Sequence, residues 1–170
     1  IEHMQLQDCA FFNVTWVKGV FDTVVLENCR FEQVLLLESQ FTNKDFTGLT
    51  FMRCTCNDSY FEDCKFSGAM LNASNFSKSK LLNCDFSKAS LLQGLFIESQ
   101  VDKCCFDEAL MKHANFQEAK VSDSSFEAAD LEKAWMKGIE LSKVSFAKAC
   151  LEAVTLQYAV LDKCSLKKAV

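Results

Sequence analysis

The segment "LEKAWMKGIELSKVSFAKACLEAVTLQYAV", residues 131–160, carries a large apolar side chain at every fifth position, from Leu131 to Leu156. Two residues before each of the later ones lies another apolar residue, in most cases a small one such as Ala134 or Ala149. A five-residue step rotates an α-helix by about 140°, so these side chains would scatter around a helix. An ordinary strand, whose side chains alternate with a period of two residues, does not keep every fifth residue on one face either. The spacing therefore predicts a chain that turns a corner every five residues.

The same spacing runs through all 170 residues. All 34 positions whose numbers end in 1 or 6 (the large slots) are apolar, and they hold 15 of the 16 Phe. The positions ending in 4 or 9 (the small slots) hold ten Ala, seven Cys, six Ser, five Val and two Gly, with Met4, Lys44, Leu49 and Ile139 as exceptions. If both slots point inward, four sides of five residues close a square coil of about 20 residues, and successive coils stack as parallel strands.

The stretch "ASNFSKSKLLNCDFSKAS", residues 73–90, resembles the pentapeptide repeat family, whose idealised unit is a small residue, Asn or Asp, Leu or Phe, and two polar residues. The resemblance covers the whole chain. It identifies a divergent Phe- and Cys-rich member, because the Asn/Asp position is often replaced, as at Lys65, Leu95, Trp135 and Val160. It implies an all-β fold, a right-handed quadrilateral parallel β-helix (solenoid) of about eight coils, whose sides are expected to bow or vary in turn type.

Residues twenty apart should then stack on one another, and the sequence supports this. Phe46, Phe66, Phe86, Phe106, Phe126 and Phe146 form one predicted column, and Ala69 begins a column of six Ala. We expect residues 1–170 to form a single β-helix domain of a longer protein. Lys44 is the exception, because an inward unpaired lysine is costly. We expect residues 42–45 to bulge, so that Lys44 turns outward or pairs with Asp45.

The ten cysteines are predicted to be reduced. Seven occupy small slots and Cys56 occupies a large slot, where cysteine packs as a compact hydrophobe. Cys105 and Cys150 should face outward and react most readily. So many unpaired thiols favour a reducing compartment, namely the cytoplasm, or the host cytoplasm if the protein is a secreted effector. Four Asn-x-Ser/Thr sequons leave a glycosylated luminal or extracellular recognition domain as a minority alternative; they begin at Asn13, Asn57, Asn72 and Asn75.

The residue types argue against an enzyme, a cofactor or a metal site. His3 and His113 are the only histidines, and there is no Cys-x-x-Cys pair, Gly-rich phosphate loop or HExxH motif. We therefore predict no catalytic, cofactor-binding or metal-binding residue, and any activity would lie in a flanking domain. The net charge of −5 gives no reason to expect nucleic-acid binding, and no apolar run approaches a membrane span of about 18 residues.

Two classes of function fit such a rod. The first is a protein-interaction or scaffold module, similar to the β-helix domains beside the catalytic lobes of some enteric-bacterial effector ubiquitin ligases, which are associated with partner binding. The second is a DNA mimic, since some pentapeptide repeat proteins protect or inhibit DNA gyrase. Acidic and basic residues number 8 and 5, 7 and 5, 4 and 4, and 4 and 3 on the four sides. Duplex DNA carries one charge per about 1.7 Å, a density that no side approaches, so the first class is favoured.

Large apolar residues at outward positions predict where a partner binds. On the third and fourth sides these are Met52, Met70, Leu92, Leu95, Ile97, Leu110 and Trp135. An exposed apolar patch usually marks an interaction surface, and Trp and Met are favoured at the centres of interfaces. The predicted partner is another protein or a flanking domain of the same chain, and an end-to-end dimer is a further prediction.

Overall fold

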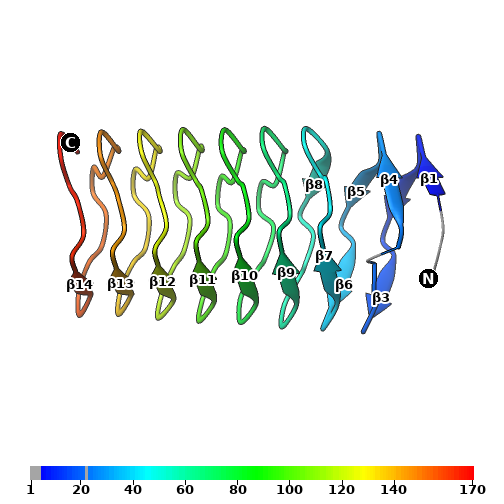
Figure 1. Cartoon of the computed structure of the whole chain (residues 1–170), viewed down its shortest axis with the longest axis horizontal. Helices are drawn as coiled ribbons and strands as arrows, with labels where there is room; N and C mark the ends of the chain where they lie inside the picture. The colour runs from blue at the N-terminus through cyan, green and yellow to red at the C-terminus, as the bar shows by residue number, and fades with distance from the viewer. Residues whose placement is uncertain (1–4, 22) are drawn as a thin grey trace.

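The computed structural model describes residues 5–21 and 23–170. It is a rod of stacked coils with β1 and β14 at opposite ends of the stack (Figure 1). The described residues contain no helix and fourteen short strands. The strands are β1 (Gln5–Gln7), β2 (Ala10–Phe12), β3 (Thr15–Val17), β4 (Val25–Glu27), β5 (Arg30–Glu32), β6 (Leu35–Leu37), β7 (Gln40–Thr42), β8 (Thr50–Met52), β9 (Tyr60–Glu62), β10 (Lys80–Leu82), β11 (Gln100–Asp102), β12 (Lys120–Ser122), β13 (Glu140–Ser142) and β14 (Val160–Asp162).

Every strand pairs in parallel with the residues twenty positions away, as Leu81 does with Phe61 and Val101. Isolated bridges outside the strands keep the same offset. The predicted fold is therefore confirmed as a right-handed quadrilateral parallel β-helix of about eight coils. We number the four sides by their large slots: the first side holds residues 21, 41 and onward, the second 26 and 46, the third 31 and 51, and the fourth 36 and 56. On the first side, β7 and β9 to β14 form a seven-stranded sheet.

The core consists of large-slot side chains stacked along the rod. In the predicted Phe column, ring centroids of neighbouring coils lie 4.6 to 5.1 Å apart, and Phe66 and Phe86 are parallel within 2°. The column also meets the rings of the fourth side edge-on, as between Phe86 and Phe96 at 6.5 Å. Burial of each ring stabilises the fold by roughly 2–3 kcal/mol, and both contact geometries suit aromatic quadrupoles.

A left-handed residue forms the corner between successive sides. These residues occupy positions ending in 3 or 8, and their φ angles lie between 45° and 68°. Most are not glycine; Lys88 and Glu108 both have a φ of 58°. Each non-glycine residue in this region costs about 1 kcal/mol or more, so the stacked core must hold the corners in place. Gly48 and Gly68 meet the same requirement without that cost.

The sides between these corners are of two kinds. This variation was expected, because the Asn/Asp position of the repeat is often replaced. In a turn side, the small-slot N–H donates to the large-slot carbonyl three residues earlier, as Ala89 does to Phe86 at 3.1 Å. In many strand sides, a polar side chain from the next coil occupies that position. Cys104 Sγ accepts from the Cys84 N–H at 3.4 Å and donates to the Leu81 carbonyl at 3.5 Å. In such a side, a polar side chain one coil away therefore replaces the hydrogen bond that closes a turn side.

Serine acts in the same way, since Ser74 Oγ accepts from the Cys54 N–H and donates to the Phe51 carbonyl. The small-slot cysteines are consequently more than the compact hydrophobes predicted above. Cys64 Sγ, for example, donates to the Phe41 carbonyl at 3.4 Å. All ten small-slot alanines, by contrast, close a turn through their own N–H. Ser74, Ser79 and Ser99 close turns in the same way, so alanine is confined to turn sides whereas serine occurs in both kinds of side.

All ten cysteines are unpaired, and six are buried. Hydrogen bonding to Cys84 and burial both raise the pKa of the Cys64 thiol far above its ordinary value. Burial raises the pKa of Cys54 to about 11. Cys105 and Cys150 are half-buried, and burial also raises the pKa of Cys105. Because thiolates are the reactive form, the core thiols should be inert near neutral pH; the order in which the outer thiols react stays a prediction.

Candidate functional site

The seven predicted surface residues differ in exposure. Met70, Leu92, Leu110 and Trp135 are exposed, by 45%, 36%, 49% and 55%. Met52, Leu95 and Ile97 are half-buried. Between residues 41 and 150, the four exposed residues are the only large apolar side chains of the described structure that are that open to solvent. All four lie on the third and fourth sides, and we call them the apolar patch.

Within one column, the outward apolar residues occur in alternate coils. Met70 and Leu110 share one column with Ser90 between them, and Leu95 and Trp135 share another with Asn115 between them. Neighbours of this kind are about 10 Å apart, twice the spacing of paired strands. The surface is therefore a set of apolar projections separated by small or polar residues, and it is less continuous than the sequence suggested.

A shallow groove of about 420 Å³ runs along the corner of the third side. Apolar Met52 and Leu92 line it together with Arg53 and His113. Ala73 occupies the corner position between Arg53 and Gln93, and its small side chain contributes to the hollow. The groove thus combines two of the predicted residues with basic side chains.

Charged residues border the patch between Leu110 and Trp135. Lys112 Nζ lies 2.6 Å from Glu132 Oε2 and 3.4 Å from Asp130 Oδ2. Lys133 contacts the other Glu132 oxygen at 2.6 Å. Hydrogen bonds from Lys112 and then from Lys133 lower the pKa of Glu132 to about 2, so this carboxylate is ionised near neutral pH. Apolar projections beside a solvated polar rim are typical of protein interfaces.

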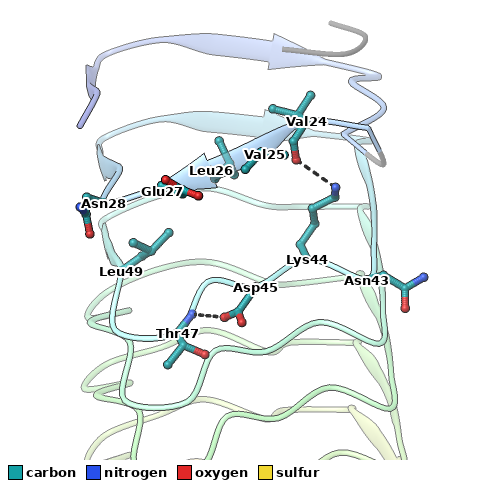
Figure 2. Close-up of a pocket in the computed structure, with 10 residues that line it drawn as sticks. All are labelled: Val24, Val25, Leu26, Glu27, Asn28, Asn43, Lys44, Asp45, Thr47 and Leu49. Atoms are coloured by element: carbon teal, nitrogen blue, oxygen red, sulfur yellow. Dashed lines mark hydrogen bonds between the residues drawn. The ribbon is translucent and has the colours of Figure 1, made fainter. Parts of the chain in front are cut away.

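A second groove, of about 600 Å³, opens on the second side between β4 and residues 43–49 (Figure 2). We call it the ladder gap. β4 pairs with β1 on one edge only. Among the described residues, no backbone hydrogen bond joins 24–28 to 44–48, whereas Phe46 and Gly48 donate normally to Lys65 and Ser67 of the next coil. The gap was not foreseen from the sequence, although Lys44 marked its position.

Lys44 spans this gap. Its ammonium donates to the Val24 carbonyl at 3.0 Å, across the groove (Figure 2). The expected bulge is wrong, because the register stays at twenty residues on both sides of Lys44: Thr42 pairs with Glu62, and Asp45 with Lys65. Asp45 instead accepts the N–H of Thr47 at 2.9 Å. Hydrogen bonds from the side chain of Thr47 and then from its backbone lower the pKa of the Asp45 carboxyl.

The C-terminal coil leaves part of the core column uncovered. Leu156, Leu161 and Leu166 are 40%, 41% and 50% exposed, although equivalent large slots within the rod are buried. This end presents an apolar surface together with unpaired strand edges, which proteins normally cover. It is therefore a second candidate contact surface.

Within residues 5–21 and 23–170, no group of three or more His, Cys, Asp or Glu side chains is arranged to hold a metal ion. The same ranges contain no helix suited to crossing a lipid bilayer.

Comparisons with known proteins agree with this architecture. Residues 54–91 and 104–142 match the family model described as pentapeptide repeats, with eight copies. A search of curated proteins found no match.

Solved structures give further matches. The chain is similar to HetL, a pentapeptide repeat protein involved in heterocyst differentiation regulation from the cyanobacterium Nostoc sp. strain PCC 7120; identity is 19%, 99% of this chain and 87% of HetL are covered, and the TM-score is 0.68. It is similar to a pentapeptide repeat protein of the Arabidopsis thaliana thylakoid lumen at 27% identity, with 56% of this chain and 67% of the other covered and a TM-score of 0.54. A trypsin-treated variant of QnrB1, a plasmid-mediated fluoroquinolone resistance protein, matches at 15% identity over 95% of this chain and 91% of the other, with a TM-score of 0.53.

Proposed function

Because this chain belongs to the pentapeptide repeat family, we propose that it is a non-catalytic protein-interaction module whose docking face is the apolar patch. The observation that carries the proposal is the location of Met70, Leu92, Leu110 and Trp135. They are the large apolar residues most exposed in the middle coils, and all lie on two adjacent sides. A partner would cover these projections, and the charges around Lys112 would form the polar rim.

The rod supports such a role physically. Its core stacks with fixed registers from coil to coil, so outward side chains keep constant spacings along the axis. A surface that is already ordered loses little conformational entropy on binding. The module is therefore suited to presenting side chains that lie far apart along the chain at fixed distances.

The double variant Leu110→Asp with Trp135→Asp tests the patch. Both side chains are about half exposed, so the fold should persist, while binding of a partner captured by the wild-type protein should weaken at least tenfold, or about 1.4 kcal/mol. The matched control is Val17→Asp, which charges a similarly exposed apolar residue at 53% in an N-terminal coil. Unchanged binding of the folded double variant would place the interface elsewhere.

The DNA-mimic alternative finds less support. Lysines neutralise acidic residues in neighbouring coils, as between Lys120 and Glu140 at 3.1 Å and between Lys143 and Asp123 at 3.2 Å. A mimic of duplex DNA needs a continuous acidic surface. The likeness to QnrB1 concerns the fold alone. Supercoiling assays with purified DNA gyrase would test this alternative; inhibition at micromolar or lower concentration would favour it over the interaction module.

We also propose a compartment, a parent protein and an end contact for this module. The ten unpaired thiols favour a reducing compartment such as the cytoplasm. A role as the partner-binding domain of a bacterial effector, within a longer protein, rests on the family resemblance. The exposed Leu156, Leu161 and Leu166 suit either a flanking segment of the same chain or a second copy in an end-to-end dimer.

A further inference from the structure

The ladder gap has two edges, or banks, formed by residues 26–28 and residues 45–47. Backbone groups on these two banks face each other without partners in the described structure. On one bank, the N–H groups of Leu26 and Asn28 have no acceptor across the gap. On the other bank, the Asp45 N–H and the carbonyls of Asp45 and Thr47 are also without a backbone partner. At the next junction of the same side, the corresponding groups are all bonded, as Phe46 N–H is to the Lys65 carbonyl at 2.7 Å.

These groups have the pattern that a parallel strand requires. An extended segment lying between the banks would accept hydrogen bonds from Leu26 and Asn28 on one edge. On its other edge it would accept from the Asp45 N–H and donate to the Asp45 and Thr47 carbonyls. Strand addition of this kind derives affinity from main-chain hydrogen bonds and specificity from alternate side chains. Figure 2 shows β4 and the chain around Asp45 bordering the groove.

The side chains of the gap define what such a strand would carry. Leu26 and Leu49 line the groove and would contact an inward apolar residue at the centre of the segment. Outward residues on either side would lie between Val25 and Asp45 and between Glu27 and Thr47, by the parallel register. Two carboxylates therefore border the outward positions, which favours Lys or Arg there, since opposite charges on neighbouring strands attract.

We propose that the ladder gap is a docking site for a short extended peptide segment with a basic–apolar–basic pattern, which inserts as one strand between β4 and residues 45–47. The site adds to the proposed interaction function, but it does not depend on the apolar patch. Lys44 keeps the site open, because its long side chain occupies a small slot and takes the Val24 carbonyl that the Asp45 N–H would otherwise use.

Fluorescence anisotropy with a labelled synthetic peptide, acetyl-Ser-Lys-Val-Lys-Ser-Ala-amide, tests the proposal on the full chain. Saturable binding is expected. Two matched peptides should bind at least tenfold more weakly: one with N-methylated backbone amides at the central residues, which cannot donate, and one with Glu in place of both Lys. These peptide changes leave the protein untouched, so they report on docking even if a protein variant misfolds.

Protein variants complete the test. Lys44→Val restores a small-slot residue and should weaken peptide binding at least tenfold by closing the gap. Lys65→Ala, which removes an exposed lysine of the same side one coil further on, should not. The Leu110→Asp, Trp135→Asp double variant should bind the peptide as the wild type does, which separates this site from the apolar patch. Absence of saturable binding to the wild type, or equal binding of the N-methylated peptide, would overturn the proposal.

Discussion

Two successive coil junctions on the second side behave differently. Between residues 24–28 and 44–48 the described structure has no backbone hydrogen bond, and the Lys44 ammonium reaches across instead. Between 44–48 and 64–68 three bonds close the ladder: Lys65 N–H to Lys44, Phe46 N–H to Lys65, and Gly48 N–H to Ser67, at 2.8, 2.7 and 3.0 Å. The large slots at both junctions are apolar, so the core column does not account for the difference.

The small slot does account for it. The open junction carries Lys44 in this slot, and the closed junction carries Cys64, which is 1% exposed and hydrogen-bonded to the Phe41 carbonyl. A long cationic side chain does not fit a buried position without access to water or an acceptor. The small slot at the start of the side therefore differs between the open and the closed junction, and we infer that the lysine there holds the two coils apart.

Placing a lysine in the closed junction should have the largest effect. Cys64→Lys would put an ammonium in a fully buried small slot, and we expect a loss of about 3–5 kcal/mol in the free energy of unfolding. Urea denaturation measures this loss. Lys65→Ala, at an exposed position next to it, is the control and should change stability by no more than about 0.5 kcal/mol. If both variants were equally stable, the small slot would not control closure.

The reverse change should stabilise the protein. Lys44→Val gives the open junction the type of residue found at Val24 and Val144, and it allows the coils to close. A few new backbone hydrogen bonds should add about 1–2 kcal/mol to the free energy of unfolding. Thermal denaturation checks the direction, since the melting temperature should rise; a fall would mean that Lys44 contributes more by its bond to Val24 than it costs.

A subtler change tests the distinction between strand sides and turn sides. Cys104→Ala removes the thiol that lies between the Cys84 N–H and the Leu81 carbonyl. We expect a loss of about 1 kcal/mol, partly offset if the two groups bond directly as in a turn side. Cys104→Ser keeps a donor and an acceptor and should cost less. A larger loss for serine than for alanine would argue that cysteine acts there only as a hydrophobe.

The smallest effect concerns pH. Glu132 has its pKa lowered from 4.5 to about 2 by Lys112 and Lys133. A carboxyl with a depressed folded pKa contributes stability that is fully present above about pH 4.5 and is lost as pH falls toward 2. The carboxylate is half-buried, but its lysine partners are exposed to water, so the contribution is small. Glu132→Gln should reduce the slope of the free energy of unfolding against pH in this window, as measured by chemical denaturation. An unchanged slope would show that Glu132 does not contribute to the pH dependence of stability.

The fold was predictable because its information is local and repeated. The large slots alone determine the period, and the Phe column then follows from spacing by twenty residues. The exposed patch residues were also identifiable, since outward positions are known once the period is known. Leu95 and Ile97 proved half-buried because neighbouring coils shield a side chain in ways that one coil does not reveal.

The ladder gap could not be derived in the same way. The sequence marked Lys44 as anomalous, but a bulge, an outward rotation and a separation of coils all relieve a buried charge. The choice depends on the packing of residues 24–28 against 44–48, which lie twenty positions apart. The hydrogen-bonding roles of Cys and Ser were missed for a related reason. Whether a side needs such a residue is indicated by the small slot one coil further on, as Cys104 shows for the side that begins at Lys80. Comparing each side with the small slot of the next coil would have revealed these roles.

Amide hydrogen exchange of the full chain, resolved by NMR, tests the difference between the two junctions most directly. The N–H groups of Leu26, Asn28 and Asp45 face the gap, and those of Phe46, Gly48 and Lys65 close the next junction. We predict rapid exchange for the first three and strong protection for the last three, with protection appearing at Leu26, Asn28 and Asp45 in Lys44→Val. Equal protection of both sets in the wild-type protein would contradict the account, because it would show that the ladder is closed at Lys44.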